Sequence, residues 1–148
     1  MNQLRTSPAP IYSPKFPLLP GTPPASHLPL NPILYLTIAI DSVAPLIRIR
    51  RISGAAGGGR ALEMPDPIAL RTRRRTAFQW ILDVVNSKPS KGSGRKQLPV
   101  RIADEVIAVI EGRSSVWEKR RVVHKIGTAA RANVGKKINI KNSLGGKG

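Results

Sequence analysis

Three groups of residues have side chains or spacing that could support chemistry. Asp104 and Glu105 are adjacent carboxylates, His124 is one of two histidines, and Gly57–Gly59 is a glycine cluster. Neighbouring positions on a helix point about 100° apart, so the two carboxylates are poorly placed to act as a facing acid–base pair. We expect them to balance nearby arginines instead.

His124 and the glycine cluster also lack the partners that a reactive site needs. No second ligand lies at metal-binding spacing from His124. The glycines lack the Gly-Lys-Ser/Thr ending of a phosphate loop and do not lead directly into a helix. The sequence is compatible with a serine–histidine–carboxylate catalytic site, but no nucleophile-elbow pattern supports one. With no cysteine in the chain, we predict no catalytic residues, no metal site and no cofactor, hence no enzyme.

The strongest chemical signal is an excess of positive charge. The 148 residues include 25 Lys+Arg against 8 Asp+Glu, a formal net charge of +17. A compact domain with this imbalance repels itself unless a polyanion neutralises it, and the usual polyanions are nucleic acids and anionic membranes. The longest apolar run, 33–40, is far shorter than the ~20 residues of a membrane span. We therefore predict a nucleic-acid partner and no membrane.

The stretch 46–82 concentrates much of this charge. Its first part alternates apolar and basic residues, a glycine-rich turn follows, and a second extended run reaches Pro65 and Pro67. This pattern predicts a two-stranded β-hairpin over 46–68. A hairpin alone is marginally stable in water, so we expect this one to be mobile until it docks. Its candidate phosphate-binding residues are Arg48, Arg50, Arg51 and Arg60.

A helix is predicted directly after the hairpin, at about 72–86. Apolar residues recur there at helical spacing, at Ala77, Phe78, Ile81, Leu82 and Val85. Basic side chains at a helix start oppose the helix dipole, which favours anions there. The sequence therefore predicts an external source of negative charge at this helix start. The candidate binding residues are Arg71, Arg73, Arg74 and Arg75.

Further helices are predicted on both sides of this stretch. Asn31 is a candidate N-cap for a helix over 33–43, which is apolar on nearly all sides and must be buried by other elements. A helix that opens at Leu98–Pro99 should end at Gly112, in a left-handed conformation. Glu105 should lie off the buried stripe of that helix, which is Ala103, Val106, Ile107 and Ile110.

A last helix is predicted to begin at a capping box that runs from Ser115 to Glu118. The predicted buried face is Val116, Val123, Ile126 and Ala130. The basic residues on its remaining surface are Lys119, Arg120, Arg121, Lys125 and Arg131. This helix and the one before it, over 100–132, also resemble a helix-turn-helix. The alternative function is therefore a DNA-binding regulator that reads the major groove through Arg120, Arg121 and Lys125.

The two ends of the chain differ in composition from the middle. Residues 1–30 hold eight of the fourteen prolines and are predicted to be an extended or disordered tail. The segment 135–148 is rich in lysine and glycine and is predicted to be a loose basic tail. The predicted fold is therefore mainly α: a helical bundle over 31–134 with a protruding two-stranded β-hairpin.

The order of these elements resembles the small-subunit ribosomal protein S7 family, and it looks closest to the fungal mitochondrial members. The pieces that carry the resemblance are RTRRRTAFQWIL at 71–82, Ala103-Asp104-Glu105 followed by Glu111-Gly112, and Lys119-Arg120 followed by His124 and Ala130-Arg131-Ala132. Members of the family carry additional helices and a basic arm ahead of the segment that begins here at Pro32. This chain has the proline-rich residues 1–30 there.

The resemblance implies a structural protein of the mitochondrial small ribosomal subunit. It implies binding to small-subunit ribosomal RNA and to neighbouring small-subunit proteins, and support for assembly of the subunit head and for translation. It also implies that the hairpin lies near exit-site transfer RNA and the messenger RNA path. The RNA-binding residues would be the arginines of the hairpin and of the following helix start, together with Lys119, Arg120, Lys125 and Arg131.

Overall fold

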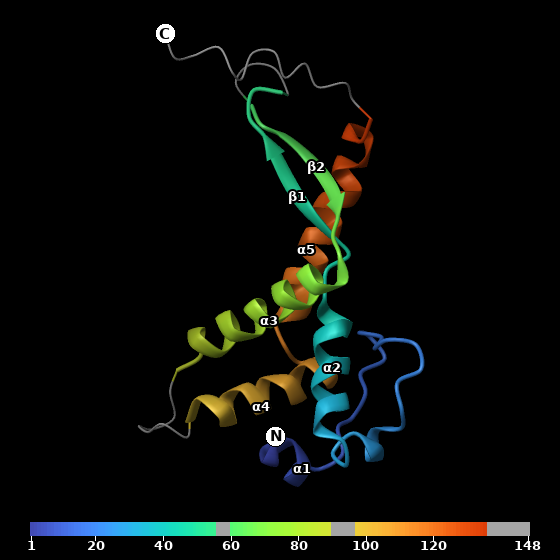
Figure 1. Cartoon of the computed structure of the whole chain (residues 1–148), viewed down its shortest axis with the longest axis vertical. Helices are drawn as coiled ribbons and strands as arrows, with labels where there is room; N and C mark the ends of the chain where they lie inside the picture. Colours follow the sequence, from blue (N-terminus) through green and yellow to red (C-terminus); the bar gives the residue numbers. More distant parts are fainter. Residues whose placement is uncertain (56–59, 90–96, 136–148) are drawn as a thin grey trace.

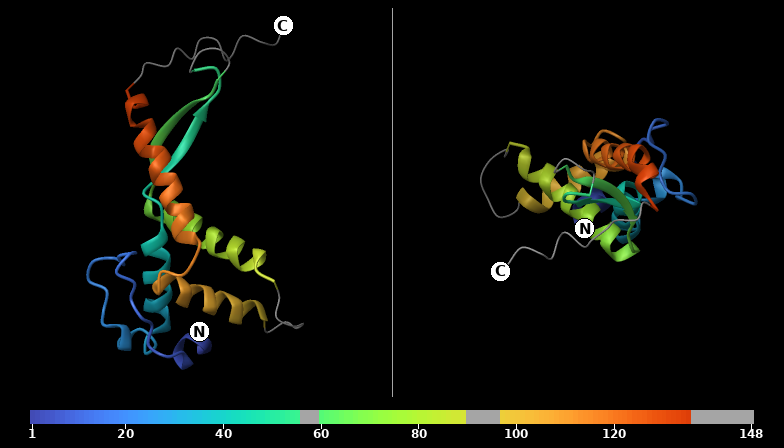
Figure 2. Two further views of the ribbon diagram at one scale, coloured as in Figure 1. Left: turned by 180° about the vertical axis from the view of Figure 1, so that it is seen from behind. Right: turned by 90° about the horizontal axis from the view of Figure 1, so that it is seen from above.

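The computed structural model describes residues 1–55, 60–89 and 97–135 (Figure 1). In chain order the elements are α1 (Asn2–Thr6), the 3-10 helix η1 (Ala25–His27), α2 (Pro32–Val43), β1 (Ile47–Ile52), β2 (Leu62–Pro67), α3 (Leu70–Ser87), α4 (Gln97–Ile110), α5 (Val116–Ala129) and the 3-10 helix η2 (Ala130–Asn133). Helices α2, α3, α4 and the start of α5 form a body, from which the β1–β2 ribbon and the rest of α5 extend together (Figures 1 and 2). The predicted mainly α fold with a protruding hairpin is confirmed.

Helix α2 begins where its sequence predicts. The Asn31 side chain accepts a hydrogen bond from the Leu34 N–H at 3.1 Å, and Pro32 occupies the first helical position. Tyr35 and Ala39 are buried in the body, where α2 contacts α3 and α4. Its first turn is open, because Ile33 is 69% exposed. Elsewhere α1, α5 and the N-terminal segment also contact the helix, so the expectation that other elements cover it is met over most of its length.

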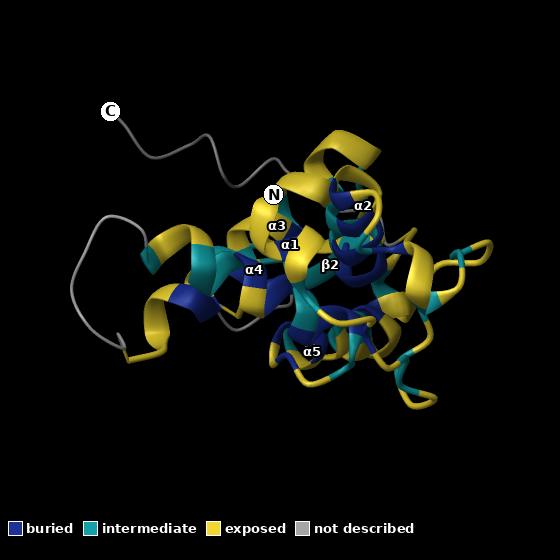
Figure 3. Cartoon of the chain, turned by 90° about the horizontal axis from the view of Figure 1, so that it is seen from below, coloured by how far each residue is buried: buried dark blue, intermediate teal, exposed yellow. Residues whose placement is uncertain are grey.

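The hydrophobic core lies where the helices of the body converge, and Figure 3 shows the buried residues gathered there. Ala77, Ile81 and Val85 of α3 are buried as their spacing predicts, whereas Phe78 is 39% exposed. The start of α5 is attached to α4 because the Trp117 indole N–H donates to the carbonyl oxygen of Val109 at 2.9 Å. Among the described residues, no helix combines the length and the apolar character that crossing a bilayer requires.

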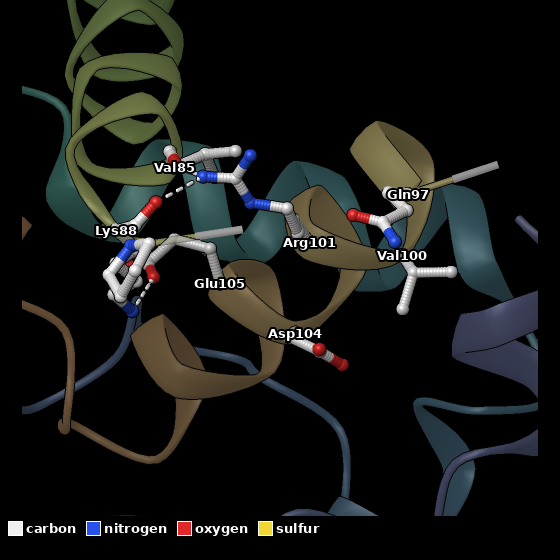
Figure 4. Close-up of a pocket in the computed structure, with 8 residues that line it drawn as sticks. Val85, Lys88, Gln97, Val100, Arg101, Asp104 and Glu105 are labelled. Atoms are coloured by element: carbon white, nitrogen blue, oxygen red, sulfur yellow. Dashed lines mark hydrogen bonds and ion pairs between the residues drawn. The ribbon is translucent and has the colours of Figure 1, made fainter. Parts of the chain in front are cut away.

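Arg101 of α4 satisfies the carbonyl groups at the C-terminal end of α3. Its guanidinium donates to the carbonyl oxygens of Val85 and Lys88, and the second of these distances is 2.6 Å (Figure 4). The last carbonyls of a helix have no partner within the helix, so a bound arginine stabilises that end. This contact joins α3 to α4 beside the shallow pocket between the two helices, which the same residues line.

Glu105 occupies a different place from the one its sequence position predicts. It is 1% exposed rather than off the buried stripe. Its carboxylate pairs with the Lys88 ammonium and accepts a hydrogen bond from the Ser114 hydroxyl (Figure 4 shows the first pair). A buried carboxylate is stable only with such partners, and both come from segments outside its own helix. The periodicity of α4 alone contained no information about them.

The cap of α5 also differs from the prediction. Ser115 makes no side-chain capping bond, and Glu118 pairs with Arg121 on the same helix. Instead, the hydroxyl oxygen of Ser114 accepts a hydrogen bond from the Val116 N–H at 3.1 Å. Because Glu105 holds the Ser114 hydroxyl, the buried carboxylate supports the start of α5. The capping box Ser115–Glu118 predicted from the sequence is therefore wrong.

The proline-rich segment 1–30 is largely irregular, as its prolines predict, but it lies against the body. Leu4 and Leu28 are buried, and Phe16 packs against the core. The Tyr12 hydroxyl donates to the carbonyl oxygen of Pro23 at 2.6 Å, which holds the segment to itself. Figure 1 shows it folded back beside α2. The sequence predicts an extended or disordered tail here, because proline fixes φ and donates no hydrogen bond and no helical or strand period is present.

The N-terminal segment crosses the turn between α4 and α5 at Gly112. This glycine has a φ of +72°, the left-handed conformation that its position predicts. A Cβ atom built on Gly112 would lie 2.6 Å from the Cβ of Ser13. The absence of a side chain therefore serves two needs at once: it permits the turn and admits the N-terminal segment above it.

The ribbon pairs β1 with β2 in antiparallel register, with Ile47 opposite Pro67 and Ile49 opposite Pro65. The second strand thus runs through both prolines rather than ending before them. The Ile68 N–H donates to the carbonyl oxygen of Leu46, which continues the ladder. Along an antiparallel strand, the backbone nitrogens point alternately to the partner strand and to the free edge. Those of Pro65 and Pro67 point to the free edge, where no N–H donor is needed.

The ribbon lies along α5 rather than standing alone. Gly127 of α5 is buried, and a Cβ atom built there would lie only 2.0 Å from the Cδ1 of Ile47. Near the end of the ribbon, the Asn133 side chain donates to the carbonyl oxygen of Glu63 at 2.9 Å. The ribbon is therefore docked on α5 and η2 within the chain itself, while its mobility before docking stays a prediction. The predicted turn at 57–59, most of the basic loop after α3 and the tail from 136 lie outside the described residues.

The close approach of Ile47 to α5 at Gly127 predicts the effect of adding a side chain at that position. Gly127→Leu should destabilise the protein by about 1–3 kcal/mol, because a side chain there displaces the ribbon. The measurement is the free energy of unfolding in urea. Ala129→Leu, which adds the same side chain at an exposed position of α5, is the control and should change little. Equal stability of the two variants would contradict the packing.

The structural role of Glu105 can be tested by comparing its substitution with that of its neighbour Asp104. Glu105→Ala should destabilise the protein by about 1–3 kcal/mol, because the Ser114 hydroxyl loses its acceptor and the α5 cap loses its support. Asp104→Ala removes the same charge one residue earlier, at an exposed position, and should change stability by less than about 0.5 kcal/mol. Urea unfolding of both variants measures the difference, and a small effect for Glu105→Ala would contradict the assigned role.

Candidate nucleic-acid interface

The arginines of the ribbon lie at its surface and pair across the strands. Arg48 and Arg50 share Asp66, with N–O distances of 4.0 and 2.9 Å. Arg51, on the other face of the ribbon, pairs with Glu63 at 3.1 Å. The three arginine side chains are between 51% and 72% exposed. Exposed ion pairs contribute little to stability, so these guanidinium groups can exchange a carboxylate for another anion.

The arginines at the start of α3 divide into two kinds. Arg74 donates to both carboxylate oxygens of Asp41 on α2, at 2.7 and 2.6 Å, and this pairing raises the pKa of Arg74. Arg73 donates to the carbonyl oxygen of Pro45 at 3.1 Å, at the entry to the ribbon. Both therefore connect elements of this chain. Arg71 and Arg75 are exposed and make no hydrogen bond or ion pair with any described residue.

A second group of basic residues lies on α5. Lys119 reaches Asp83 of α3 at 3.4 Å, so it joins the two helices. Lys125 and Arg131 are exposed and have no polar partner among residues 1–55, 60–89 and 97–135, and the same holds for Arg60 just before β2. The predicted residues therefore include both structural cations and cations available to a ligand. The available ones are Arg60, Arg71, Arg75, Lys125 and Arg131.

The junction of α3, α5 and the ribbon holds positive groups close to one another. Burial, and then the neighbouring charge of Arg73, lower the pKa of Arg120. The Nε atom of Arg120 is buried and has no hydrogen-bond partner within the described part of the chain. A buried, unpaired donor on a charged group is unfavourable. An added anion at the junction would therefore offset positive charge that the described part of the chain leaves without a carboxylate partner.

His124 belongs to the same junction and has a defined tautomer. Its Nε2 atom accepts a hydrogen bond from the Leu46 N–H at 3.1 Å, so the neutral ring carries its proton on Nδ1. Burial, and then the charges of Arg120 and Arg73, lower the pKa of His124. The sequence presents His124 only as a candidate catalytic or metal-ligating residue and does not predict this bond, because Leu46 lies 78 positions away. No group of three or more metal-ligating side chains occurs among the described residues.

The candidate residues come together on three neighbouring elements. The ribbon, the start of α3 and the length of α5 meet at the base of the ribbon (Figures 1 and 2). Helices α4 and α2 support them from the body and contribute none of the predicted residues. The structure thus places the predicted residues on neighbouring elements, and whether they form one binding surface stays a prediction.

The helix-turn-helix alternative receives no support from this arrangement. A recognition helix must be free to enter a DNA groove. Helix α5 carries the ribbon along one side at Gly127. On another side the Phe16 ring of the N-terminal segment stacks on Trp117, with the ring centroids 5.1 Å apart. A helix covered in this way is a poor reader of a major groove.

Fold and surface together define a basic, mainly α protein whose cationic ribbon is supported by its last long helix. Comparison with protein-family models finds one match, to the family described as ribosomal protein S7p/S5e, over residues 25–131. The match covers most of the chain, so the chain belongs to the ribosomal protein S7p/S5e family.

Individual relatives agree with this assignment. The chain is 66% identical over 134 residues to the small ribosomal subunit protein uS7m of Neurospora crassa, and 34% identical over 103 residues to the uS7m of Schizosaccharomyces pombe. A bacterial uS7, from Alcanivorax borkumensis, is 31% identical over 98 residues. These alignments cover 90%, 70% and 64% of this chain, but only 43%, 37% and 55% of the three relatives. The chain thus spans about half the length of the relatives it matches.

The bond between His124 and Leu46 predicts a pH dependence of stability. The pKa of His124 in the folded protein lies below its ordinary value of 6.5, so the unfolded chain takes up a proton at higher pH than the folded one. Stability should be constant above about pH 6.5 and should fall as the pH drops below it. Urea unfolding between about pH 5 and about pH 8 measures this dependence.

Two variants isolate the contribution of His124. His124→Gln should remove the part of the pH dependence near pH 6, because the amide oxygen can accept the Leu46 N–H without titrating. His27→Gln, in the N-terminal segment, should behave as the unmodified protein. Identical pH profiles for the unmodified protein and His124→Gln would exclude this bond as the cause.

Proposed function

We propose that this chain is a structural, non-catalytic constituent of the small subunit of the mitochondrial ribosome. It binds small-subunit ribosomal RNA, contacts neighbouring small-subunit proteins and supports assembly of the subunit head and translation. The single observation that carries the proposal is membership of the ribosomal protein S7p/S5e family, with the fungal uS7m proteins among its relatives. The names of those relatives support the mitochondrial location.

The physical properties of the surface support RNA as the ligand. A net charge of +17 favours a polyanion, and five of the predicted cations have no polar partner among the described residues: Arg60, Arg71, Arg75, Lys125 and Arg131. A-form RNA has a deep, narrow major groove, so a protein meets its phosphates and its shape rather than its base edges. A guanidinium can bond two phosphate oxygens at once, which suits arginine to this task.

The paired arginines of the ribbon fit this proposal as well. Each of Arg48, Arg50 and Arg51 has a carboxylate beside it in the free protein, which limits repulsion along β1. On binding, a phosphate can take the place of the carboxylate at little net loss, because the pairs are exposed. In this proposal the hairpin lies near exit-site transfer RNA and the messenger RNA path.

Arg71 and Arg75 provide the sharpest test of the interface. The double variant Arg71→Ala/Arg75→Ala should weaken binding to a head-domain ribosomal RNA transcript by at least about tenfold at low salt. It should also lower the slope of log K against log salt by roughly 0.7–0.9 for each lost phosphate contact. Stability should be nearly unchanged, because neither side chain has a polar partner among the described residues.

The control removes two charges elsewhere. Arg5→Ala/Arg113→Ala changes the net charge equally, at exposed positions away from the ribbon. It should leave the affinity close to that of the unmodified chain. Equal weakening by both double variants would mean that only net charge matters, and the proposed surface would then be wrong. Arg73 and Arg74 are unsuitable for this test, because they also hold Pro45 and Asp41.

The class of nucleic acid and the location are tested separately. Unlabelled duplex DNA should compete for the labelled ribosomal RNA much less well than unlabelled ribosomal RNA does. Tagged protein expressed in fungal cells should sediment with the mitochondrial small subunit. Preferential binding to duplex DNA, or absence of the chain from that fraction, would contradict the proposed function.

A further inference from the structure

A pocket lined with basic residues lies between the N-terminal segment and α5. It has a volume of about 530 Å³ and no acidic residue in its lining. The N-terminal segment contributes Lys15 and Phe16, and α5 contributes Trp117 and a row of basic side chains. That row is Arg120, Arg121, His124 and Lys125.

The polar groups of this pocket are suited to an anion. The buried Nε of Arg120 lacks an acceptor within the described residues. The Nδ1–H of His124 is available as a donor, because Nε2 already accepts the Leu46 N–H. The Lys15 ammonium lies 5.7 Å from the centroid of the Phe16 ring and has no carboxylate partner within the described residues. The pocket therefore presents several donors and no carboxylate in its lining.

We infer that this pocket binds a backbone phosphate of RNA, with Arg120 and Lys15 as its anion-binding residues and His124 as a further donor. The N-terminal segment, which the sequence predicts to be an extended or disordered tail, thereby becomes part of the RNA interface. The inference rests on the proposed function and deepens it. It adds a defined site on α5 to the exposed arginines of the ribbon and of α3.

Two observations favour an RNA phosphate over a free small anion. The pocket is far larger than a lone phosphate ion, so it has room for the sugar on either side of a phosphodiester. Lys125 belongs both to the pocket lining and to the exposed surface of α5 that leads to Arg131 and the ribbon. A strand of RNA that lies along the basic surface can therefore place one phosphate in the pocket without leaving that surface.

Arg120→Met separates a ligand-binding role from a structural one. Methionine keeps an apolar stem but removes the guanidinium group, whose Nε is buried and has no partner among the described residues. The melting temperature of the free protein should therefore stay equal or rise. Affinity for the head-domain ribosomal RNA transcript should fall about tenfold, with a salt slope lower by roughly 0.7–0.9. A fall in melting temperature would indicate a structural role for Arg120 and would overturn the assignment.

Lys15→Ala tests the site from the other element. Lys15 is exposed, so the variant should fold normally and still lower the RNA affinity and the salt slope. Arg5→Ala, an equal loss of charge at another exposed position of the N-terminal segment, is the control and should have no effect. In a double-variant cycle, Lys15→Ala and Arg120→Met should be less than additive if both groups bind one phosphate. Full additivity, or an equal effect of Arg5→Ala, would contradict a shared site.

The remaining outcomes distinguish this inference from the proposed function. If the unmodified chain does not bind the transcript, both fail. If it binds, and both pocket variants bind equally well, the pocket is wrong while the proposed function stands. The competing source of phosphate is tested with inorganic phosphate alone. Suppose that inorganic phosphate stabilises the unmodified protein but not Arg120→Met, and that the two proteins bind RNA equally well. That result would assign the pocket to a free anion and overturn the inference.

Discussion

The packing of the ribbon on α5 is the contact on which the arrangement of this protein depends. It is possible because Gly127 has no side chain, so Ile47 reaches the surface of the helix. A two-stranded ribbon has too little apolar area to be stable alone, and α5 supplies the missing face. In return, the arginine-bearing strand β1 is held beside the helix that carries Arg120 and Lys125. Loss of this contact would separate two halves of one surface.

The basic residues of this small fold are of two kinds. Some cations are structural: Arg74 holds Asp41, and Arg101 holds the end of α3. Others have no partner within the described residues, and Arg120 has a buried nitrogen without an acceptor. This arrangement lowers the stability of the free protein, because like charges remain close to one another. It is understandable in a chain of a ribosomal protein family whose natural environment is rich in phosphate.

Much of the fold could be predicted from local patterns. The cap at Asn31, the alternation of β1 and the glycine at 112 each act within a few residues, so their effects are visible in the sequence. The burial of Glu105 and the true cap of α5 could not be predicted in this way. The partners of Glu105 are Lys88, at the end of α3, and Ser114, in the turn between α4 and α5. They approach Glu105 only after α3, α4 and this turn have packed together.

The sequence by itself determined the elements, the excess of positive charge and the resemblance to the S7 family, because propensity, periodicity and composition are local or additive properties. Tertiary structure alone decided which arginines are bound to carboxylates and which are free. It also brought Lys15 beside α5 and His124 beside Leu46. The physical reason is that electrostatic and hydrogen-bond partners are chosen by distance in space, and distant segments become neighbours only when the core forms.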